Sequence, residues 1–155
     1  MKRTCGFFIY DLERAKLLIG HSTDTKNMFS IPKGQQDENE VDKETAIRET
    51  YEETGLVYDE LDIITEYELP EIIYRSKKKV LKSYLIIVKT LIDNEIRCLS
   101  NFIDKDGNEK PEMDYFKWVD LNEASTLLPK SQIALLPEIK ENILATIGIV
   151  SVLDY

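Results

Sequence analysis

Hydrophobic residues form two short continuous runs near the start of the chain. Residues 4–11, TCGFFIYD, and residues 15–22, AKLLIGHS, are rich in aromatic and branched apolar side chains, and a polar stretch from Asp11 to Arg14 separates them. Runs of this length are typical of buried strands, and a short polar link between two of them is typical of a hairpin turn. The chain is therefore predicted to open with a strand pair, followed by a short strand at residues 27–32.

The next segment has the features of a loop followed by a helix. Residues 32–39 combine a proline, a glycine and polar side chains, which favours a loop. Residues 42–54 are predicted to form a helix, because Asp42 is a suitable N-cap and Gly55 stands just past the last residue.

The second half of the chain returns to strands before it ends in helices. Residues 61–70 and 79–92 are predicted strands, and the second has the continuous apolar centre of a buried one. The polar residues 100–114 predict a loop with a turn at Asp106-Gly107. Three further elements follow: a strand at residues 115–121, a short helix at residues 121–128, and a closing helix at residues 131–147 that Pro137 kinks or interrupts.

These elements predict one α/β domain spanning residues 1–155, with a mixed sheet packed between helices. A chain of this length can bury a core without disulfides, and no repeat or Gly/Ser linker indicates a second domain. The apolar C-terminal run IGIVSVLDY either covers the core or supplies a dimer contact. Both a monomer and a homodimer therefore stay open.

Composition excludes several classes of protein. No apolar run approaches the roughly 18 to 20 residues of a membrane helix, and Asp11 interrupts the N-terminal apolar stretch before it resembles a secretory signal. We therefore expect a cytoplasmic protein. The formal net charge of −9 disfavours nonspecific nucleic-acid binding, which depends on Lys and Arg at phosphates. Cys5 and Cys98 have no cysteine or histidine at metal-ligand spacing, so we expect buried thiols.

The predicted helix 42–54 concentrates three carboxylates on one face. At about 100° per residue, Glu52 and Glu53 fall about 60° and 40° on either side of Glu49. Like charges so spaced repel, and Arg48 can pair with only part of them. A bound divalent cation removes this penalty, because Mg²⁺ binds carboxylates, waters and substrate phosphates. A solvated acidic face is the simpler alternative.

The spacing of the whole stretch favours the metal site. Gly34 is followed by Glu40, by the pair Arg48-Glu49, by the pair Glu52-Glu53 and finally by Gly55-Leu56. This pattern is that of the Nudix box, and the chain therefore resembles the Nudix hydrolases. Thr50 is a departure, since the family usually has a larger aliphatic residue there, and we expect looser packing beneath the helix.

The resemblance implies a fold, a reaction and a set of metal ligands. Nudix hydrolases are α/β/α sandwiches that cleave nucleoside diphosphates linked to another group, with Mg²⁺ or Mn²⁺. Carried over, Glu49, Glu52 and Glu53 are metal ligands, Gly34 contributes its carbonyl oxygen, and Arg48 orients the carboxylates.

A second resemblance concerns the general base, for which Glu49 is one candidate. The segment PEMDYFKWVDL, residues 111–121, is similar to one in bacterial RNA pyrophosphohydrolases and, more loosely, in diadenosine tetraphosphate hydrolases. In those families a glutamate six residues before the tryptophan is a metal ligand or the base. Glu112 matches it and becomes a further candidate for both roles.

Substrate phosphates require positive charge. Lys33 stands beside the glycine loop, and a basic group surrounds the start of the strand at residues 79–92: Arg75, Lys77, Lys78, Lys79 and Lys82. Diadenosine tetraphosphate hydrolases have a phosphate-binding lysine and an adenine-stacking tyrosine near the start of a similar strand, which implies these roles for Lys82 and Tyr84. For Tyr84, a place in the core is an equal alternative. We expect His21, the only histidine, to be a surface or edge residue.

The resemblance favours a dinucleoside polyphosphate of the diadenosine tetraphosphate type, or an RNA 5′ end, as the substrate. Two alternatives stay open. One is a pyrophosphatase acting on ADP-ribose or on a dinucleotide coenzyme such as FAD or NADH. The other is a non-catalytic domain that senses nucleotides, although such domains usually lack the box glutamates that are present here.

Overall fold

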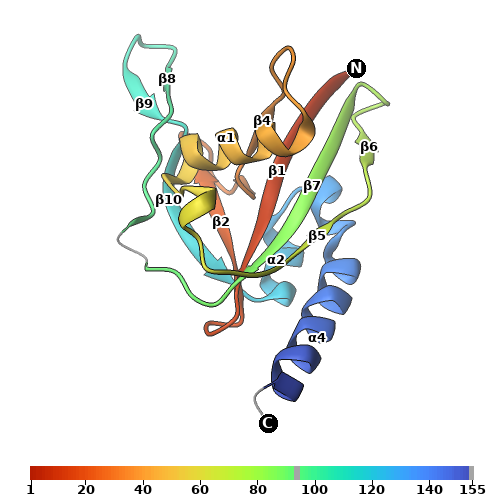
Figure 1. The fold of residues 1–155 in the computed structure, drawn as a ribbon. Helices are drawn as coiled ribbons and strands as arrows, with labels where there is room; N and C mark the ends of the chain where they lie inside the picture. The colour runs from red at the N-terminus through yellow and green to blue at the C-terminus, as the bar shows by residue number, and fades with distance from the viewer. Residues whose placement is uncertain (93–94, 154–155) are drawn as a thin grey trace.

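The computed structural model describes residues 1–92 and 95–153, and its centre is a mixed eight-stranded sheet (Figure 1). The strand order along the main path is β10-β2-β1-β7-β5. These strands span Lys2–Asp11 (β1), Lys16–Ser22 (β2), Ile63–Glu68 (β5), Lys79–Val88 (β7) and Met113–Val119 (β10). β1 and β7 run parallel over the whole length of both strands, whereas the other pairs along this path are antiparallel.

Shorter strands extend this framework. Three of them pair with the main strands: β3 (Phe29–Ser30) with β2, β4 (Lys33–Gln35) with β1, and β6 (Ile72–Tyr74) with β7. Within the described residues, β8 (Asn101–Ile103) and β9 (Glu109–Pro111) pair only with each other. Figure 1 shows this β8–β9 hairpin projecting from the body near one end of α1 (Asp42–Thr54).

Helices cover both faces of the sheet and create two apolar cores. On one face, Ala46 of α1 packs with Phe7 and Ile86, next to a 3-10 helix at Tyr58–Glu60. On the other face, Phe8 and Leu85 pack against the C-terminal helices. These helices are α2 (Leu121–Leu127), α3 (Lys130–Ile133) and α4 (Leu136–Leu153). The predicted α/β/α sandwich is confirmed, and within the described residues none of the helices is long and apolar enough to span a membrane.

The predicted first helix is confirmed, but its N-cap is not Asp42. Val41 is the N-cap residue, and the side chain of Glu44 accepts a hydrogen bond from its backbone N–H at 3.1 Å. Asp42 is the first helical residue, and its carboxylate is held instead by Arg3, Nη2 to Oδ2 at 2.6 Å. At the other end, Gly55 takes the predicted left-handed conformation, with a φ of 74°.

Two predictions for the second half of the chain need correction. Residues 100–114 are not one loop, because they contain β8, β9 and the first residues of β10, although the predicted turn at Gly107 is present. The closing helix is divided at residues 134–135, before Pro137. Pro137 lies in the first turn of α4, where a missing backbone N–H breaks no helical bond.

The last turns of α4 do not cover the core. Ile149, Val152 and Leu153 are 59%, 72% and 78% exposed. The predicted core cover is therefore wrong for the described part of this segment, while residues 154–155 lie outside the described residues. The dimer contact stays a prediction.

Candidate active site

Arg48 connects the acidic residues of α1 with the loop in front of the helix. Its Nη1 lies 2.9 Å from Oε1 of Glu49 and 3.2 Å from Oε2 of Glu52, which confirms the predicted pairing with Glu52. Its Nε donates to Glu40 at 2.8 Å, and its Nη2 donates to the carbonyl oxygen of Gln35 at 3.0 Å. This guanidinium lowers the pKa of Glu40 to about 2, so Glu40 is ionised near neutral pH.

Gly34 is required by the position of Glu49. Gly34 pairs with Cys5 in the β4–β1 ladder, which fixes its backbone beside α1. A Cβ atom at this position would lie 1.9 Å from the carboxyl carbon of Glu49. The glycine therefore allows the carboxylate of Glu49 to approach the loop backbone closely.

Glu53 is a buried carboxyl group. Its side chain is 4% exposed, and Oε1 accepts a hydrogen bond from the backbone N–H of Lys33 at 2.8 Å. Burial is the main cause of a pKa raised to about 8 for Glu53; the charges of Glu49 and Glu112 act in the same direction and this hydrogen bond opposes them. The pKa of Glu49 is also raised, first by burial. These side chains therefore lie where negative charge is costly and a cation would relieve the cost.

The oxygen ligands that Glu49, Glu52, Glu53 and the carbonyl group of Gly34 could supply suit a hard divalent cation. Carboxylate oxygens and a backbone carbonyl beside an unhindered glycine are the ligands such ions prefer. Among residues 1–92 and 95–153, no three acidic, histidine or cysteine side chains are already gathered as a metal centre. In this structure the carboxylates of Glu49 and Glu52 are both paired with Arg48.

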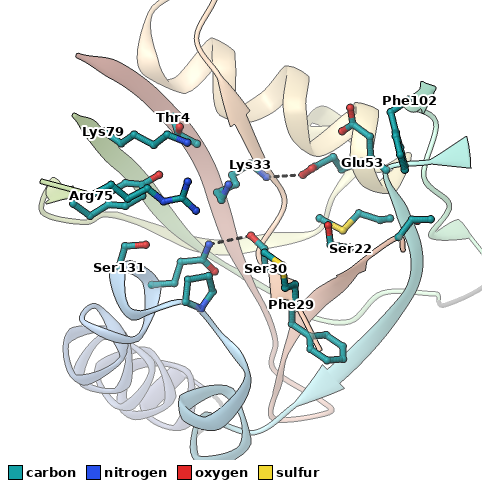
Figure 2. A pocket seen from close by; sticks show the side chains of 17 residues that line it. Thr4, Ser22, Phe29, Ser30, Lys33, Glu53, Arg75, Lys79, Phe102 and Ser131 are labelled. Carbon is teal, nitrogen blue, oxygen red and sulfur yellow. Dashed lines mark hydrogen bonds between the residues drawn. The ribbon is translucent and has the colours of Figure 1, made fainter. Parts of the chain in front are cut away.

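A pocket of about 540 Å³ borders this acidic group (Figure 2). Five residues that the sequence made candidates line it, namely Lys33, Glu53, Arg75, Lys79 and Glu112. Figure 2 shows Arg75 and Lys79 on the opposite side of the pocket from Glu53, with Lys33 between. The pocket thus joins an acidic end to a cationic end, as a polyphosphate bound through cations and lysines requires.

Lys82 and Tyr84 do not line this pocket, and their predicted contacts with substrate stay a prediction. Tyr84 packs in the core beneath α1, and Lys82, two residues earlier in β7, shares its face of the sheet. Nζ of Lys82 lies 2.6 Å from Oε1 of Glu68 and donates to the carbonyl oxygen of Leu69 at 3.1 Å. Lys79, at an odd position of β7, faces the pocket instead.

Sequence reasoning missed Gln132 and Phe102, which also line the pocket. Gln132 is fully buried, and it donates to Oγ of Ser30 at 2.9 Å while accepting from the backbone N–H of Ile31 at 3.1 Å. A glutamine in an apolar helical stretch is the one local sign of this role. Phe102 had no signal, because it lies in the segment predicted as a loop.

The expectation that His21 lies at the surface is wrong. Its side chain is buried because β2 pairs with β10 on one side and with β3 on the other. The imidazole stacks on Tyr115 with 4.5 Å between centroids, and its Nδ1 lies 2.7 Å from Oδ1 of Asp114. Of the two cysteines, Cys5 is buried as predicted and Cys98 only partly so.

Thr50 allows a test of the packing beneath the acidic helix. Its side chain is 3% exposed, and its hydroxyl has no hydrogen-bond partner within the described residues. Thr50→Val should raise the free energy of unfolding by about 1 kcal/mol, because an unsatisfied buried hydroxyl is replaced by a methyl group of similar volume. Thermal unfolding followed by circular dichroism measures this as a rise in Tm of about 2 to 4 °C.

Thr54→Val is the matched control in the same helix. The Thr54 hydroxyl is buried but satisfied: it donates to the carbonyl oxygen of Thr50 at 2.5 Å and accepts from the N–H of Leu56 at 3.1 Å. Its loss should lower Tm. A lower Tm for Thr50→Val as well would show that the Thr50 hydroxyl is satisfied in solution.

Comparisons with known proteins agree with this geometry. The sequence matches the model of the NUDIX domain over residues 2–140. The bis(5′-nucleosyl)-tetraphosphatase (asymmetrical) of Rattus norvegicus is 33% identical over 135 residues, which cover 81% of this chain and 83% of the rat protein. An RNA pyrophosphohydrolase of Pelagibacter ubique is 24% identical over 152 residues, covering 92% of this chain and 91% of that protein.

Solved structures share the fold. A C. elegans Ap4A hydrolase in a binary complex superposes with a TM-score of 0.72 at 21% identity, covering 92% of this chain and 98% of that one. The E. coli dihydroneopterin triphosphate pyrophosphohydrolase gives a TM-score of 0.67 at 17% identity, covering 90% and 95% of the two chains. Since the NUDIX match extends over most of the sequence, this chain belongs to the Nudix family of hydrolases.

Proposed function

We propose that this Nudix pyrophosphohydrolase cleaves a phosphoanhydride of a dinucleoside polyphosphate, of the diadenosine tetraphosphate type. The observation that carries the proposal is the pocket with an acidic end at Glu53 and Glu112 and a cationic end at Arg75 and Lys79. Substrates with several consecutive phosphates need both, a cation platform at the bond that breaks and direct positive charge along the rest of the chain. The similarity to the rat tetraphosphatase supports this choice.

We assign the metal platform to residues of the Nudix box together with Glu112. Glu49, Glu52 and Glu53, the carbonyl oxygen of Gly34 and the carboxylate of Glu112 would hold Mg²⁺ or Mn²⁺. When bound, such an ion offsets charge on phosphate oxygens and lowers the pKa of water toward neutrality. Nudix hydrolases in general use divalent cations, and the raised pKa of buried Glu53 supports a cation here.

The protein's own groups then position the reactants. Arg48 holds Glu49 and Glu52 in place through its contacts with both carboxylates. Glu49 and Glu112 are the candidates for the base that removes a proton from the attacking water. A pH profile of kcat/KM for Glu112→Gln that loses its acidic limb would assign the base to Glu112, and an unchanged profile would assign it elsewhere.

Lys33, Lys79 and Arg75 are proposed to bind the phosphates away from the cleaved bond. Arg75 belongs to the turn between β6 and β7, where three consecutive residues, 75 to 77, have φ values of 51°, 55° and 68°. Left-handed backbone costs about 1 to 2 kcal/mol at each residue other than glycine. Such strain is often found at ligand-binding turns, and here it presents a cation to the pocket.

An RNA 5′ end is a second candidate, supported by the similarity to RNA pyrophosphohydrolases along nearly the whole chain. It offers the same run of phosphates attached to one nucleoside. The pyrophosphatases of ADP-ribose, FAD or NADH stay as alternatives with only two phosphates, which would leave part of the cationic end unused.

The test is a substrate panel assayed with Mg²⁺. It contains diadenosine tetraphosphate, 5′-triphosphorylated RNA, ADP-ribose, FAD, NADH and nucleoside triphosphates, and released nucleotides are separated by ion exchange. We expect the highest kcat/KM for diadenosine tetraphosphate. A preference for ADP-ribose or a coenzyme would contradict the proposal. Binding without turnover of any substrate would identify a nucleotide sensor.

A further inference from the structure

The β8–β9 hairpin brings an aromatic side chain to the acidic end of the pocket. Phe102, in β8, is half-buried and lines the pocket. Figure 2 shows Phe102 on the same side as Glu53, with Arg75 and Lys79 on the opposite side. The hairpin has no strand partner in the main sheet among the described residues, so something other than sheet pairing must fix its position.

Backbone hydrogen bonds join the residues just before the hairpin to α1. The N–H groups of Leu99 and Ser100 both donate to the carbonyl oxygen of Glu52, at 2.7 and 2.9 Å. The N–H of Glu112 donates to the carbonyl oxygen of Ser100 at 3.0 Å. The hairpin thus starts at the end of α1 and ends at Glu112, which fixes Phe102 relative to the proposed metal ligands.

A lysine joins the hairpin to the β2–β3 loop. Lys110 pairs with Phe102 across the hairpin, and its Nζ lies 2.9 Å from Oδ2 of Asp24, in the β2–β3 loop. The same Nζ lies 2.9 Å from Oδ2 of Asp104. Two segments distant in sequence are therefore held together around this end of the pocket.

Two methionines line the same pocket as Phe102. Met28 is 59% exposed, and its carbonyl oxygen accepts a hydrogen bond from the N–H of Ser22 at 2.8 Å. Met113 pairs with the same Ser22 in the β10–β2 ladder, directly after Glu112. We call Phe102, Met28 and Met113 the apolar shelf, since all three line the pocket.

We propose that the apolar shelf is a nucleobase subsite, which binds the base of one nucleoside of the substrate. The proposal rests on the proposed function, because it takes the polyphosphate to lie between the glutamates and the lysines. Beyond the cation platform, Lys110 is paired with both Asp24 and Asp104, so this side of the pocket offers a further phosphate less positive charge than the side of Arg75 and Lys79. A planar, uncharged ring that follows the phosphates fits this end, since the aromatic ring of Phe102 is a suitable surface for stacking and the thioethers of Met28 and Met113 line the same pocket.

The first test compares Phe102→Ala with Ile103→Ala. Ile103 is the next residue of β8, is 65% exposed and does not line the pocket, so it is the matched control. Loss of one stacked base should raise KM for diadenosine tetraphosphate about 10- to 100-fold in Phe102→Ala. Phe102→Trp should return KM to near its wild-type value, and Ile103→Ala should leave KM unchanged.

Inorganic tripolyphosphate separates stacking from a general disturbance of the site. It has phosphoanhydrides and no base, so its inhibition constant against diadenosine tetraphosphate should be the same in wild type and Phe102→Ala. If Phe102→Ala weakened the binding of tripolyphosphate and of diadenosine tetraphosphate by the same factor, Phe102 would have only a structural role. A KM within about twofold of wild type would overturn the subsite directly, since loss of a stacked base costs more than that.

A second test needs no turnover. Phe102→Trp adds a tryptophan to the single native Trp118, whose signal in wild type is subtracted. Adenosine should quench the added fluorescence, whereas ribose 5-phosphate should not, and Ile103→Trp should respond to neither. Quenching without hydrolysis of any substrate would refute the proposed function but keep the subsite. Hydrolysis of diadenosine tetraphosphate without quenching would refute the subsite alone.

Discussion

Glu53→Gln is expected to lose most hydrolytic activity, with kcat reduced about a hundredfold or more under saturating Mg²⁺. The change removes one negative charge from the proposed cation platform without changing the size of the side chain. Cation stabilisation of a phosphoryl transition state is worth several kcal/mol, and each 1.36 kcal/mol corresponds to about tenfold in rate. Initial rates with diadenosine tetraphosphate measure the loss. If Glu53→Gln kept nearly full turnover, Glu53 would not be a ligand of the cation.

The same variant should be more stable than wild type when metal is absent, which separates lost chemistry from lost folding. Burial raises the pKa of Glu53 to about 8, whereas the unfolded carboxyl group ionises at about 4.3. The folded protein therefore holds an extra proton between these values, and its free energy of unfolding falls as the pH rises through that window. Urea unfolding in EDTA from about pH 5 to about pH 9 should show this fall in wild type and a flatter profile in Glu53→Gln.

Gly34→Ala is expected to reduce activity by a comparable factor through geometry. The new Cβ would lie 1.9 Å from the carboxyl carbon of Glu49, so either β4 or the carboxylate must move. A displacement of about 1 Å at a catalytic group can cost a factor of about a hundred. Overpacking of this kind also destabilises a fold, by about 1 to 3 kcal/mol. Steady-state rates and thermal unfolding measure the two effects.

Gly148→Ala is the matched control for this substitution. Gly148 lies within α4, and a Cβ there would meet no atom within 4 Å. It should leave activity unchanged and raise stability by about 1 kcal/mol, because alanine is the better helix former. Wild-type activity in Gly34→Ala would mean that Glu49 does not need its close approach to the loop.

Local sequence patterns predicted the parts of the site that one helix supplies. The positions of Arg48, Glu49, Glu52 and Glu53 follow from helical periodicity alone, so the amino-acid sequence is sufficient to predict their common face. Gly34 was added to the predicted site because of its spacing from these residues. Its closeness to Glu49 explains why a glycine is needed at this position. The predicted N-cap was wrong because the distant Arg3 binds the carboxylate of Asp42.

Assignments that depended on strand faces were less successful. Lys82 and Lys79 are three residues apart in one strand, so they lie on opposite faces, and only the neighbouring helices decide which face borders the pocket. The burial of His21 depends on its pairing with β3 and β10. These strands cover His21 only once the sheet has formed, so the residues next to it in the sequence do not reveal its burial. Phe102 and Gln132 reach the pocket through tertiary contacts that no short motif records.

The separation between the acidic helix and the pocket walls has an evolutionary consequence. Glu53 projects from α1, which packs on the long β1–β7 pair, whereas Arg75, Phe102 and Ser131 come from a turn, a hairpin and a short helix. Loops and isolated hairpins tolerate exchange of length and composition better than a packed sheet. New substrate preferences can therefore be acquired by replacing these peripheral segments without rebuilding α1 or the sheet beneath it.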